Sequence, residues 1–450
     1  MAKTYDTYKN SGIAWIGEIP GEWEVCRLKS QFKASKGLNI TKENLKEEGY
    51  PVISYGQIHA KNNCGTSISQ ELIRFISNSY IDSNPECLTN KGCFIFADTS
   101  EDIEGCGNAV YVNSGSIFAG YHTIILKPKF GTSNKYLAYL FLTDCWRSQI
   151  RASVSGIKVL SITQKIINTT SILLPPLSVQ QSISSFLDEK CGEIDSLISI
   201  QEEMISELLA YKQSVITEAV TKGLDKKAKM KNSGVEWIGD IPEEWEIKPY
   251  KAIFYTEKGL NITKADLVEK GEPVLSYGQI HSKMNTGTKI NDALLKYVPS
   301  SYIETNPECL VQKGCFLIAD TSEDYDGCGN AIYVDKDMTL FAGYHTIVAR
   351  PIHNNGDYKY LAYLFLTDIW RQQIRSRVSG IKVYSINQKI IRLTSVLLPP
   401  LPVQQAIATY LDEKTTQIDS LIALKQSKIE SLKEYKKSII YEYVTGKNRV

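Results

Sequence analysis

Residues 179–220 read VQQSISSFLDEKCGEIDSLISIQEEMISELLAYKQSVITEAV, and residues 403–444 read VQQAIATYLDEKTTQIDSLIALKQSKIESLKEYKKSIIYEYV. The first stretch has no proline and one glycine, Gly192, and its apolar residues recur at seven-residue spacing, which predicts one long helix with a coiled-coil seam. A helix of roughly 40 residues is about 60 Å long and cannot bury such a seam alone. We therefore expect the two copies to pair as an antiparallel coiled coil.

The predicted seam is the same in both copies. It comprises Leu187, Ile194, Ile198, Ile205, Leu208 and Val215 in the first, and Leu411, Ile418, Ile422, Ile429, Leu432 and Ile439 in the second. Polar residues interrupt it at Gln201 and Lys212, and at Lys425 and Lys436. Polar seam residues either fix the register of the two copies or face a helix of a partner protein.

The repeat extends over the whole chain. SGIAWIGEIPGEWEV (Ser11–Val25) returns as SGVEWIGDIPEEWEI (Ser233–Ile247), and each copy passes through short β-type runs before LLPPL opens the helix. We expect an α+β fold of two homologous mixed α/β domains, 1–174 and 233–398, alternating with helical segments 175–223 and 399–450. A basic linker, 224–232, follows the first helix, and a pseudo-twofold axis would relate the halves.

Composition excludes several classes of protein. The 450 residues carry a formal net charge of +1, so no strong overall field favours nucleic acid, although a local basic face remains possible. No apolar run is long enough to span a membrane and no signal peptide is evident, which predicts a cytoplasmic protein. The spacing of the ten cysteines does not match a zinc site, which favours buried packing thiols.

The opening motifs, the LLPPLxxQQxI motif before each helix, and the alternation of domain and long helix resemble the specificity subunit of type I restriction-modification systems. The resemblance covers nearly the whole chain. It implies that the two globular domains are target recognition domains for double-stranded DNA. It also implies that the helices set the spacer and dock two modification (adenine methyltransferase) subunits, and restriction subunits where the system has them.

The chain lacks the motifs of the reactions that such a system performs. No Asn/Asp-Pro-Pro-Tyr loop of an adenine methyltransferase and no GxxxxGK[ST] phosphate loop of a translocase occurs. We expect no catalytic residue, metal or cofactor here, and we assign methylation and cleavage to partner chains. The alternative is a coiled-coil scaffold for proteins that does not read bases.

Candidate base readers are polar residues that recur at matching places, because Gln, Asp, Ser, Thr and His can all bond to base edges in the major groove. They are Ser54, Tyr55, Gln57, His59, Thr99, Ser100, Tyr121, His122 and Thr123, with copies Ser276, Tyr277, Gln279, His281, Thr321, Ser322, Tyr344, His345 and Thr346. For each tyrosine the other interpretation is packing, and for each histidine a structural hydrogen bond.

An acidic loop, ADTSEDIEGCGNA (Ala97–Ala109), returns as ADTSEDYDGCGNA (Ala319–Ala331). Its acids and hydroxyls could form a hydrolase site, but no base or ligand spacing supports one. We expect Asp98, Glu101 and Asp102, like Asp320–Asp324, to scaffold the readers or to contact bases themselves, with scaffolding favoured.

Cationic residues supply candidate phosphate contacts. Lys158 in VSGIKV and its copy Lys382 lie on a small, flexible element, which favours a phosphate contact over a solvated turn. Arg147 and Arg151, with copies Arg371 and Arg375, share a helical face that lines a phosphate track or is simply solvated, with the solvated face favoured.

The similarity of the two halves predicts their target. Most positions from Gly37 to His59 are identical to those from Gly259 to His281, including most candidate readers. Similar readers on antiparallel halves would read a split inverted repeat with an unread spacer. The segments 60–78 and 282–300 differ, and one of them could add a base preference.

Overall fold

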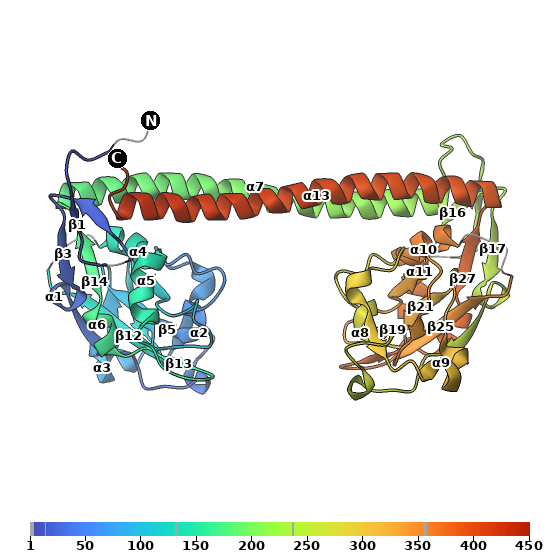
Figure 1. The fold of residues 1–450 in the computed structure, drawn as a ribbon, viewed down its shortest axis with the longest axis horizontal. Helices are drawn as coiled ribbons and strands as arrows, with labels where there is room; N and C mark the ends of the chain where they lie inside the picture. The colour runs from blue at the N-terminus through green and yellow to red at the C-terminus, as the bar shows by residue number, and fades with distance from the viewer. Residues whose placement is uncertain (1–3, 14, 131–133, 236–237, 354–357) are drawn as a thin grey trace. The chain divides into compact units, whose positions relative to one another are not determined.

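The computed structural model describes residues 4–13, 15–130, 134–235, 238–353 and 358–450. The chain forms two compact units. Unit 1 contains residues 1–202 and 427–450, and unit 2 contains residues 203–426. Each unit therefore comprises one globular head together with part of each long helix (Figure 1).

The head of unit 1 is built from short strands and helices. The strands are β1 Tyr8–Asn10, β2 Glu18–Pro20, β3 Glu24–Arg27, β4 Phe32–Lys36, β5 Tyr50–Ile53, β6 Arg74–Ile76, β7 Leu88–Asn90, β8 Phe94–Ala97, β9 Thr99–Ser100, β10 Ala109–Tyr111, β11 Ser116–Ala119, β12 Thr123–Pro128, β13 Leu160–Ser161 and β14 Ser171–Leu174. The helices are α1 Leu28–Gln31, α2 Tyr55–Ile58, α3 Tyr80–Ser83, α4 Lys135–Leu142, α5 Asp144–Arg151 and α6 Gln164–Thr169.

Two four-stranded sheets organise this head. One has the order β10-β8-β12-β4 and the other β6-β5-β11-β7. Side chains alternate across β8, so that Phe94 and Phe96 enter the core shared with α4 and α5, while Ile95 and Ala97 enter the core of the second sheet. Both cores meet at β8, whose C-terminal end leads directly into the acidic loop.

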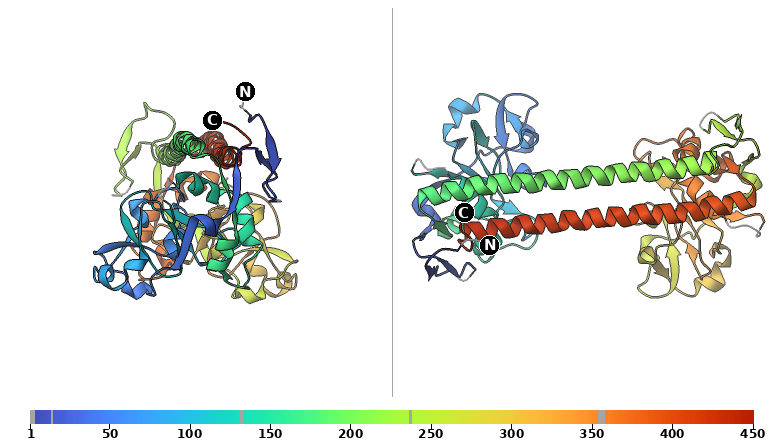
Figure 2. Two further views of the ribbon diagram at one scale, coloured as in Figure 1. Left: turned by 90° about the vertical axis from the view of Figure 1, so that its left-hand side faces the viewer. Right: turned by 90° about the horizontal axis from the view of Figure 1, so that it is seen from above.

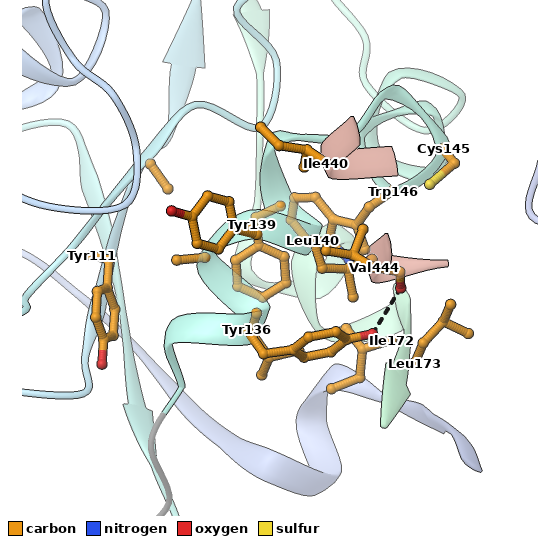
Figure 3. Close-up of a cluster of buried hydrophobic side chains, with 14 of the residues drawn as sticks. Tyr111, Tyr136, Tyr139, Leu140, Cys145, Trp146, Ile172, Leu173, Ile440 and Val444 are labelled. Atoms are coloured by element: carbon orange, nitrogen blue, oxygen red, sulfur yellow. Dashed lines mark hydrogen bonds between the residues drawn. The ribbon is translucent and has the colours of Figure 1, made fainter. Parts of the chain in front are cut away.

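The first core also holds the head against the long helices, because it includes residues of both. Figure 3 shows Ile440 and Val444 of the C-terminal helix among the side chains of α4. The Tyr136 hydroxyl on α4 donates a hydrogen bond to the backbone oxygen of Val444 at 2.8 Å, and the Tyr139 hydroxyl donates to Asp188 at 2.6 Å. Lys135 lies 3.1 Å from the same carboxylate. The LDEK motif thus contributes the acid that fixes the head to its helix.

The head of unit 2 repeats this structure. Its strands are β15 Met230–Asn232, β16 Asp240–Pro242, β17 Glu246–Pro249, β18 Phe254–Lys258, β19 Glu272–Leu275, β20 Lys296–Val298, β21 Phe316–Ala319, β22 Thr321–Ser322, β23 Ala331–Tyr333, β24 Phe341–Ala342, β25 Thr346–Pro351, β26 Tyr384–Ser385 and β27 Ser395–Leu398. Its helices are α8 Tyr277–Ile280, α9 Tyr302–Thr305, α10 Lys359–Phe365, α11 Asp368–Arg375 and α12 Gln388–Arg392.

The docking contacts of unit 2 match those of unit 1. Tyr360 donates to the backbone oxygen of Val220 at 2.8 Å, and Tyr363 donates to Asp412 at 2.7 Å. The second sheet is one strand shorter, with the order β20-β19-β24, because Leu310 forms only an isolated bridge to Phe341.

The long helices are α7, Leu177–Lys222, and α13, Leu401–Val444, within the expected segments 175–223 and 399–450. Residues 224–232, expected as a linker, end in β15.

In each unit the two long helices lie side by side and antiparallel (Figure 2). In unit 1 the rings of Phe186 and Tyr443 pack at 4.4 Å between centroids, and Lys436 bonds Asp195 at 2.7 Å. The expected α+β class and paired helices are confirmed.

The seam is buried largely within the chain itself. Leu187 and Ile194 pack with Leu432 and Ile439 in unit 1, and Val215 packs with Leu411 in unit 2. Two seam lysines find acids on the opposite helix, Lys436 at Asp195 and Lys212 at Asp419, the latter at 2.6 Å. Both lysines are therefore paired within the chain, as the register alternative expects. None of the described helices combines the length and hydropathy needed to cross a bilayer.

Candidate nucleic-acid interface

The most unusual backbone in each head belongs to a candidate reader. Among the described residues other than glycine, only His122 and His345 have a positive φ, at 53° and 55°. Such a conformation is uncommon for a residue with a Cβ and costs about 1 kcal/mol or more. It occurs between β11 and β12, where the Asp98 amide donates a hydrogen bond to the His122 oxygen at 3.1 Å. The fold thus holds a costly backbone at matching places in both heads.

The same histidines point outward and are oriented by an acid. Nδ1 of His122 lies 3.1 Å from Oδ1 of Asp98, and His345 makes the same pair with Asp320 at 3.1 Å. The histidine side chains are 59% and 56% exposed. Because a carboxylate only accepts, the pair assigns the Nδ1 proton to the ring and leaves Nε2 for an external group. The acidic loop therefore orients the histidine.

Aromatic rings pack around each histidine. The Tyr55 ring lies edge-on to Tyr121 at 5.7 Å and to His122 at 5.6 Å between centroids, and Tyr277 repeats both contacts at 5.7 Å and 5.5 Å. Burial, and then the neighbouring Tyr55, raise the pKa of the Tyr121 hydroxyl. That hydroxyl therefore stays protonated at neutral pH and can donate. We call each set of histidine, acid and two tyrosines the His–Asp–Tyr cluster.

Gln57 and Gln279 each use one side-chain atom to cap a helix. Each caps its own short helix by accepting the amide hydrogen of Ser54, at 3.1 Å, or of Ser276, at 3.0 Å, through Oε1. The side-chain amide nitrogen takes no part in this bond, and both glutamines are half-buried. They keep one functional atom for a ligand.

His59 and His281 are held inside the domain. Nε2 of His59 donates to the Thr99 oxygen at 2.8 Å, and Nδ1 accepts from Asn108 at 3.1 Å. His281 makes the same two bonds, at 2.8 Å and 3.1 Å. Both ring nitrogens are occupied, so these histidines connect α2 or α8 to the acidic loop and we leave them out of the proposed interface.

Six of the hydroxyl residues expected to touch bases are buried instead. The Ser100 hydroxyl donates to the Asp102 oxygen at 2.7 Å, and the Thr123 hydroxyl donates to the Gly120 oxygen at 2.6 Å. The buried set is Ser54, Ser100, Thr123, Ser276, Ser322 and Thr346. In this structure these side chains face the interior of the head, while Thr99 and Thr321 are partly exposed.

The expected arginine pair holds loops. Arg151 donates to the backbone oxygens of Ile103, at 3.1 Å, and Glu104, at 3.2 Å, and pairs with Asp144 at 2.8 Å. Arg147 donates to the Phe141 oxygen at 2.9 Å, and burial, followed by the charge of Arg151, lowers its pKa to about 10. The copies Arg371 and Arg375 donate to Phe365 and Asp326 backbone oxygens. The solvated face that the sequence favoured is therefore wrong, because these side chains bond to the protein's own backbone.

The arginine contacts support the scaffold interpretation of the acidic loop. Asp102 accepts the Gly105 amide hydrogen at 2.6 Å, whereas Glu101 is exposed. No group of three or more His, Cys, Asp or Glu suited to a metal ion occurs in the described part of the chain. The cysteines that recur in both halves are buried, as expected, while Cys64 is exposed. The recurring set is Cys87, Cys93, Cys106, Cys309, Cys315 and Cys328.

Lys158 and Lys382 are exposed near the tips of two hairpins. Each hairpin returns through a short strand, β13 or β26, that pairs with β9 or β22 of the acidic loop. The sequence placed the lysines on a flexible turn, and the structure adds that this turn is attached to the loop that orients His122 or His345.

The helix residues predicted to bind partners are mostly covered by the other helix of the same chain. Leu187, Ile194, Leu411, Ile418, Ile429 and Leu432 are buried, and Ile198, Ile205, Leu208 and Ile422 are partly exposed. Other large apolar side chains of the two helices are exposed. Those away from the first residue of each helix are Leu197, Ile200, Met204, Leu209, Tyr211, Leu421, Leu424 and Tyr435. Heptad spacing identified the seam and missed this second set, which lies off the seam.

Comparisons with known proteins give one consistent result. A family described as "Type I restriction modification DNA specificity domain" matches residues 20–209 and again 242–434. The MjaVIII specificity subunit of Methanocaldococcus jannaschii, a type I restriction enzyme subunit, is 24% identical over 96% of this chain and 94% of its own length. The EcoKI specificity subunit of Escherichia coli K12 is 22% identical over 46% of this chain and 44% of its own.

Solved structures share the fold. A chain from work on complex assembly and conformational transition of the type I R-M system is 16% identical, with a TM-score of 0.68 over 95% of this chain and 98% of that one. The HsdS subunit from Thermoanaerobacter tengcongensis is 15% identical, with a TM-score of 0.50 over 95% and 98%.

Proposed function

This chain belongs to the type I restriction-modification DNA specificity family, and from that premise we propose that its two heads read the two halves of a split DNA target through their His–Asp–Tyr clusters. The observation that supports this assignment is the duplicated histidine, exposed, oriented by an acid and held at positive φ in both heads. A backbone cost retained at matching places favours a role in binding over one in folding.

The chemistry of the cluster suits base edges. With its proton on Nδ1, His122 presents Nε2 as an acceptor, which fits an amino group such as N4 of cytosine or N6 of adenine in the major groove. The Tyr121 hydroxyl and the free amide nitrogen of Gln57 are donors, which fit O6 and N7 of guanine or O4 of thymine. Thr99 and Lys158 extend the proposed surface, Lys158 towards phosphate. Tyr344, Gln279, Thr321 and Lys382 do so in unit 2.

Recognition without catalysis is the role we assign to the chain. Adenine methylation and DNA cleavage would be performed by two modification subunits and by restriction subunits where present, in the cytoplasm, with no cofactor bound to this chain. The exposed apolar residues of α7 and α13 are the proposed docking surface for the modification subunits, since the seam residues are covered by the paired helix.

The target we propose is a split inverted repeat. In each unit α7 and α13 are antiparallel, and the two helices exchange roles between units: Val444 docks the first head and Val220 the second. Equal reading surfaces related by that exchange would meet opposite strands of the duplex. The paired helices would then set the unread spacer.

The test is to sequence the methylated DNA of a host that expresses this chain with its modification subunit. We expect one bipartite motif whose halves are reverse complements, with a modified adenine in each. Two unrelated half-sites would overturn the inverted repeat, and no motif that depends on this chain would overturn the reading function.

The alternative of a protein scaffold predicts a different result. Specific binding by the assembled complex should weaken as salt rises, because phosphate contacts release counterions. A scaffold that does not touch DNA would leave both the salt dependence and the motif unchanged when both His–Asp–Tyr clusters are removed.

A further inference from the structure

The tips of the two VSGIKV hairpins carry fully exposed isoleucines. Ile157 has a relative exposure of 103% and Ile381 of 98%, and the next apolar residues, Val159 and Val383, are 50% and 51% exposed. Single exposed apolar residues are common on proteins, but a β-branched side chain with no neighbour, at the same place in two heads, is not explained by packing.

The hairpins are tightly constructed. Gly156 has φ 147°, and a Cβ there would lie 2.0 Å from the Val159 oxygen, so that only glycine fits the turn. Gly380 has φ 154° and the same contact, with Val383, at 2.1 Å. An isolated bridge joins Ser155 to Ser161 at the hairpin base. The isoleucine therefore projects from a short, closed turn.

Each hairpin is attached to the acid that orients the proposed reader. The Ile162 amide, just after the hairpin, donates a hydrogen bond to the Asp98 oxygen at 2.8 Å. In unit 2 the Ile386 amide donates to the Asp320 oxygen at 2.7 Å. A duplex that contacts His122 or His345 would thus lie close to the corresponding hairpin.

The sequence segments that form the hairpins are basic, which fits DNA as the occupant, although the return strand of each hairpin pairs with the acidic loop. The chain carries no Asp or Glu from Cys145 to Leu187, nor from Ile369 to Leu411. Exposed cations lie within these segments, namely Lys158 and Lys165 in the first and Arg377, Lys382, Lys389 and Arg392 in the second. Lys158 and Lys382, next to the isoleucines in sequence, would contact phosphates, while the isoleucines would meet base pairs.

We propose that Ile157 and Ile381 insert between base pairs of their half-sites and act as wedges that unstack one step. The inference rests on the proposed function. Apolar side chains of this kind insert between adjacent base pairs in other proteins and unstack them. A partner that extrudes a base must overcome the same unstacking energy. The specificity chain would then deform the duplex as well as read it, and so lower the barrier to base extrusion by the modification subunit.

The test uses the complex of this chain with its modification subunits and duplexes that carry 2-aminopurine at successive positions across one half-site. Wild type should raise the fluorescence at one step in each half-site, because unstacked 2-aminopurine is brighter. Ile157→Ser should remove that signal in the first half-site only, and Ile381→Ser in the second only. Affinity for the intact duplex should fall about tenfold, and a mismatch at the same step should restore it.

Matched variants separate the alternatives. Ile157→Leu should keep the signal, and Ile81→Ser, which removes an exposed isoleucine from α3, should leave signal and affinity unchanged. Unchanged fluorescence in both serine variants would overturn the wedge. Loss of modification subunits from the Ile157→Ser complex would overturn it as well, because the hairpin would then be a protein contact. Failure of the wild-type complex to bind any specific sequence would instead overturn the proposed function.

Discussion

His122 shows how one residue can be assigned to binding by its backbone cost. A side chain that served folding would be expected to have an unstrained backbone and occupied polar atoms, as His59 does with both ring nitrogens bonded. His122 has the opposite properties: positive φ, an exposed ring, and only Nδ1 engaged. The contrast between these two histidines separates candidate readers that can contact DNA from those that support the loops.

This contrast predicts the effect of His122→Gly. Glycine adopts positive φ without cost, so the thermal midpoint of unfolding should stay within about 2 °C of wild type or rise. Affinity for the cognate duplex should nevertheless fall about tenfold or more, because one directed base contact is worth roughly 1–3 kcal/mol. Calorimetry and titration of labelled duplex by the assembled complex measure the two effects.

Two controls make the His122→Gly result decisive. Glu101→Gln, in the exposed part of the same loop, should change neither quantity, and Asp98→Asn should weaken binding less than His122→Gly because the ring remains. A lowered thermal midpoint with unaltered DNA affinity in His122→Gly would show that His122 is structural.

For single residues, the sequence identified candidate readers better than it predicted which of them are exposed. Repetition singled out His122, Tyr121 and Tyr55, which the structure brings together. The repetition could not show that Ser100 is buried, because the hydrogen-bond partner of its hydroxyl depends on the conformation of the loop. Nor could it show that Arg151 holds the loop around Glu104, because that contact joins residues far apart in the sequence. The hydrogen-bond partner of a polar side chain is a tertiary property that composition does not encode.

Among the elements, the two long helices were the most predictable and the small β-strands the least. Periodicity over many turns gave α7 and α13 nearly their observed bounds, because an apolar seam is a local pattern. The helical part of the head around residues 134–154 is divided into two helices, α4 and α5, which separate at Thr143, where ψ is 143°. The Thr143 hydroxyl bonds the Leu140 oxygen at 2.6 Å and so ends the first helix.

The helix pair carries a prediction about register. Asp195→Lys should place two lysines together at the Asp195–Lys436 position, and we expect a loss of about 1 kcal/mol in stability. The double variant Asp195→Lys with Lys436→Asp should recover most of it, since opposite charges again face each other. Thermal unfolding followed by circular dichroism measures both, at low and high salt.

The control for the charge exchange is Glu203→Lys, which changes the same charge at an exposed position of α7 that has no salt bridge among the described residues. It should have little effect. If the double variant were no more stable than Asp195→Lys, the Asp195–Lys436 bond would contribute nothing to the register of the helices.

For the whole molecule, the question is whether the heads are interchangeable. Each head contacts the long helices through the same two hydrogen bonds. One tyrosine hydroxyl donates to a backbone oxygen, that of Val444 in the first head and of Val220 in the second. A second tyrosine hydroxyl donates to a carboxylate, that of Asp188 or of Asp412. A head moved to the other position should therefore find matching partners. The duplicated sequence, as a repeat of complete domains, predicts this organisation.

We therefore predict that a chain carrying residues 11–174 in place of 233–398, so that it has two copies of the first head, assembles normally and methylates the wild-type motif. The converse chain, with two copies of the second head, should do the same, because a split inverted repeat requires both heads to read equal sequences. Methylated-DNA sequencing of hosts that express each chain with the modification subunit gives the outcome. Two different symmetric motifs from the two chains would mean that exposed differences such as Asn62 against Met284, or Ile103 against Tyr325, read bases. The wild-type target would then combine one half of each, and the inverted-repeat proposal would fail while the reading function of both heads would stand.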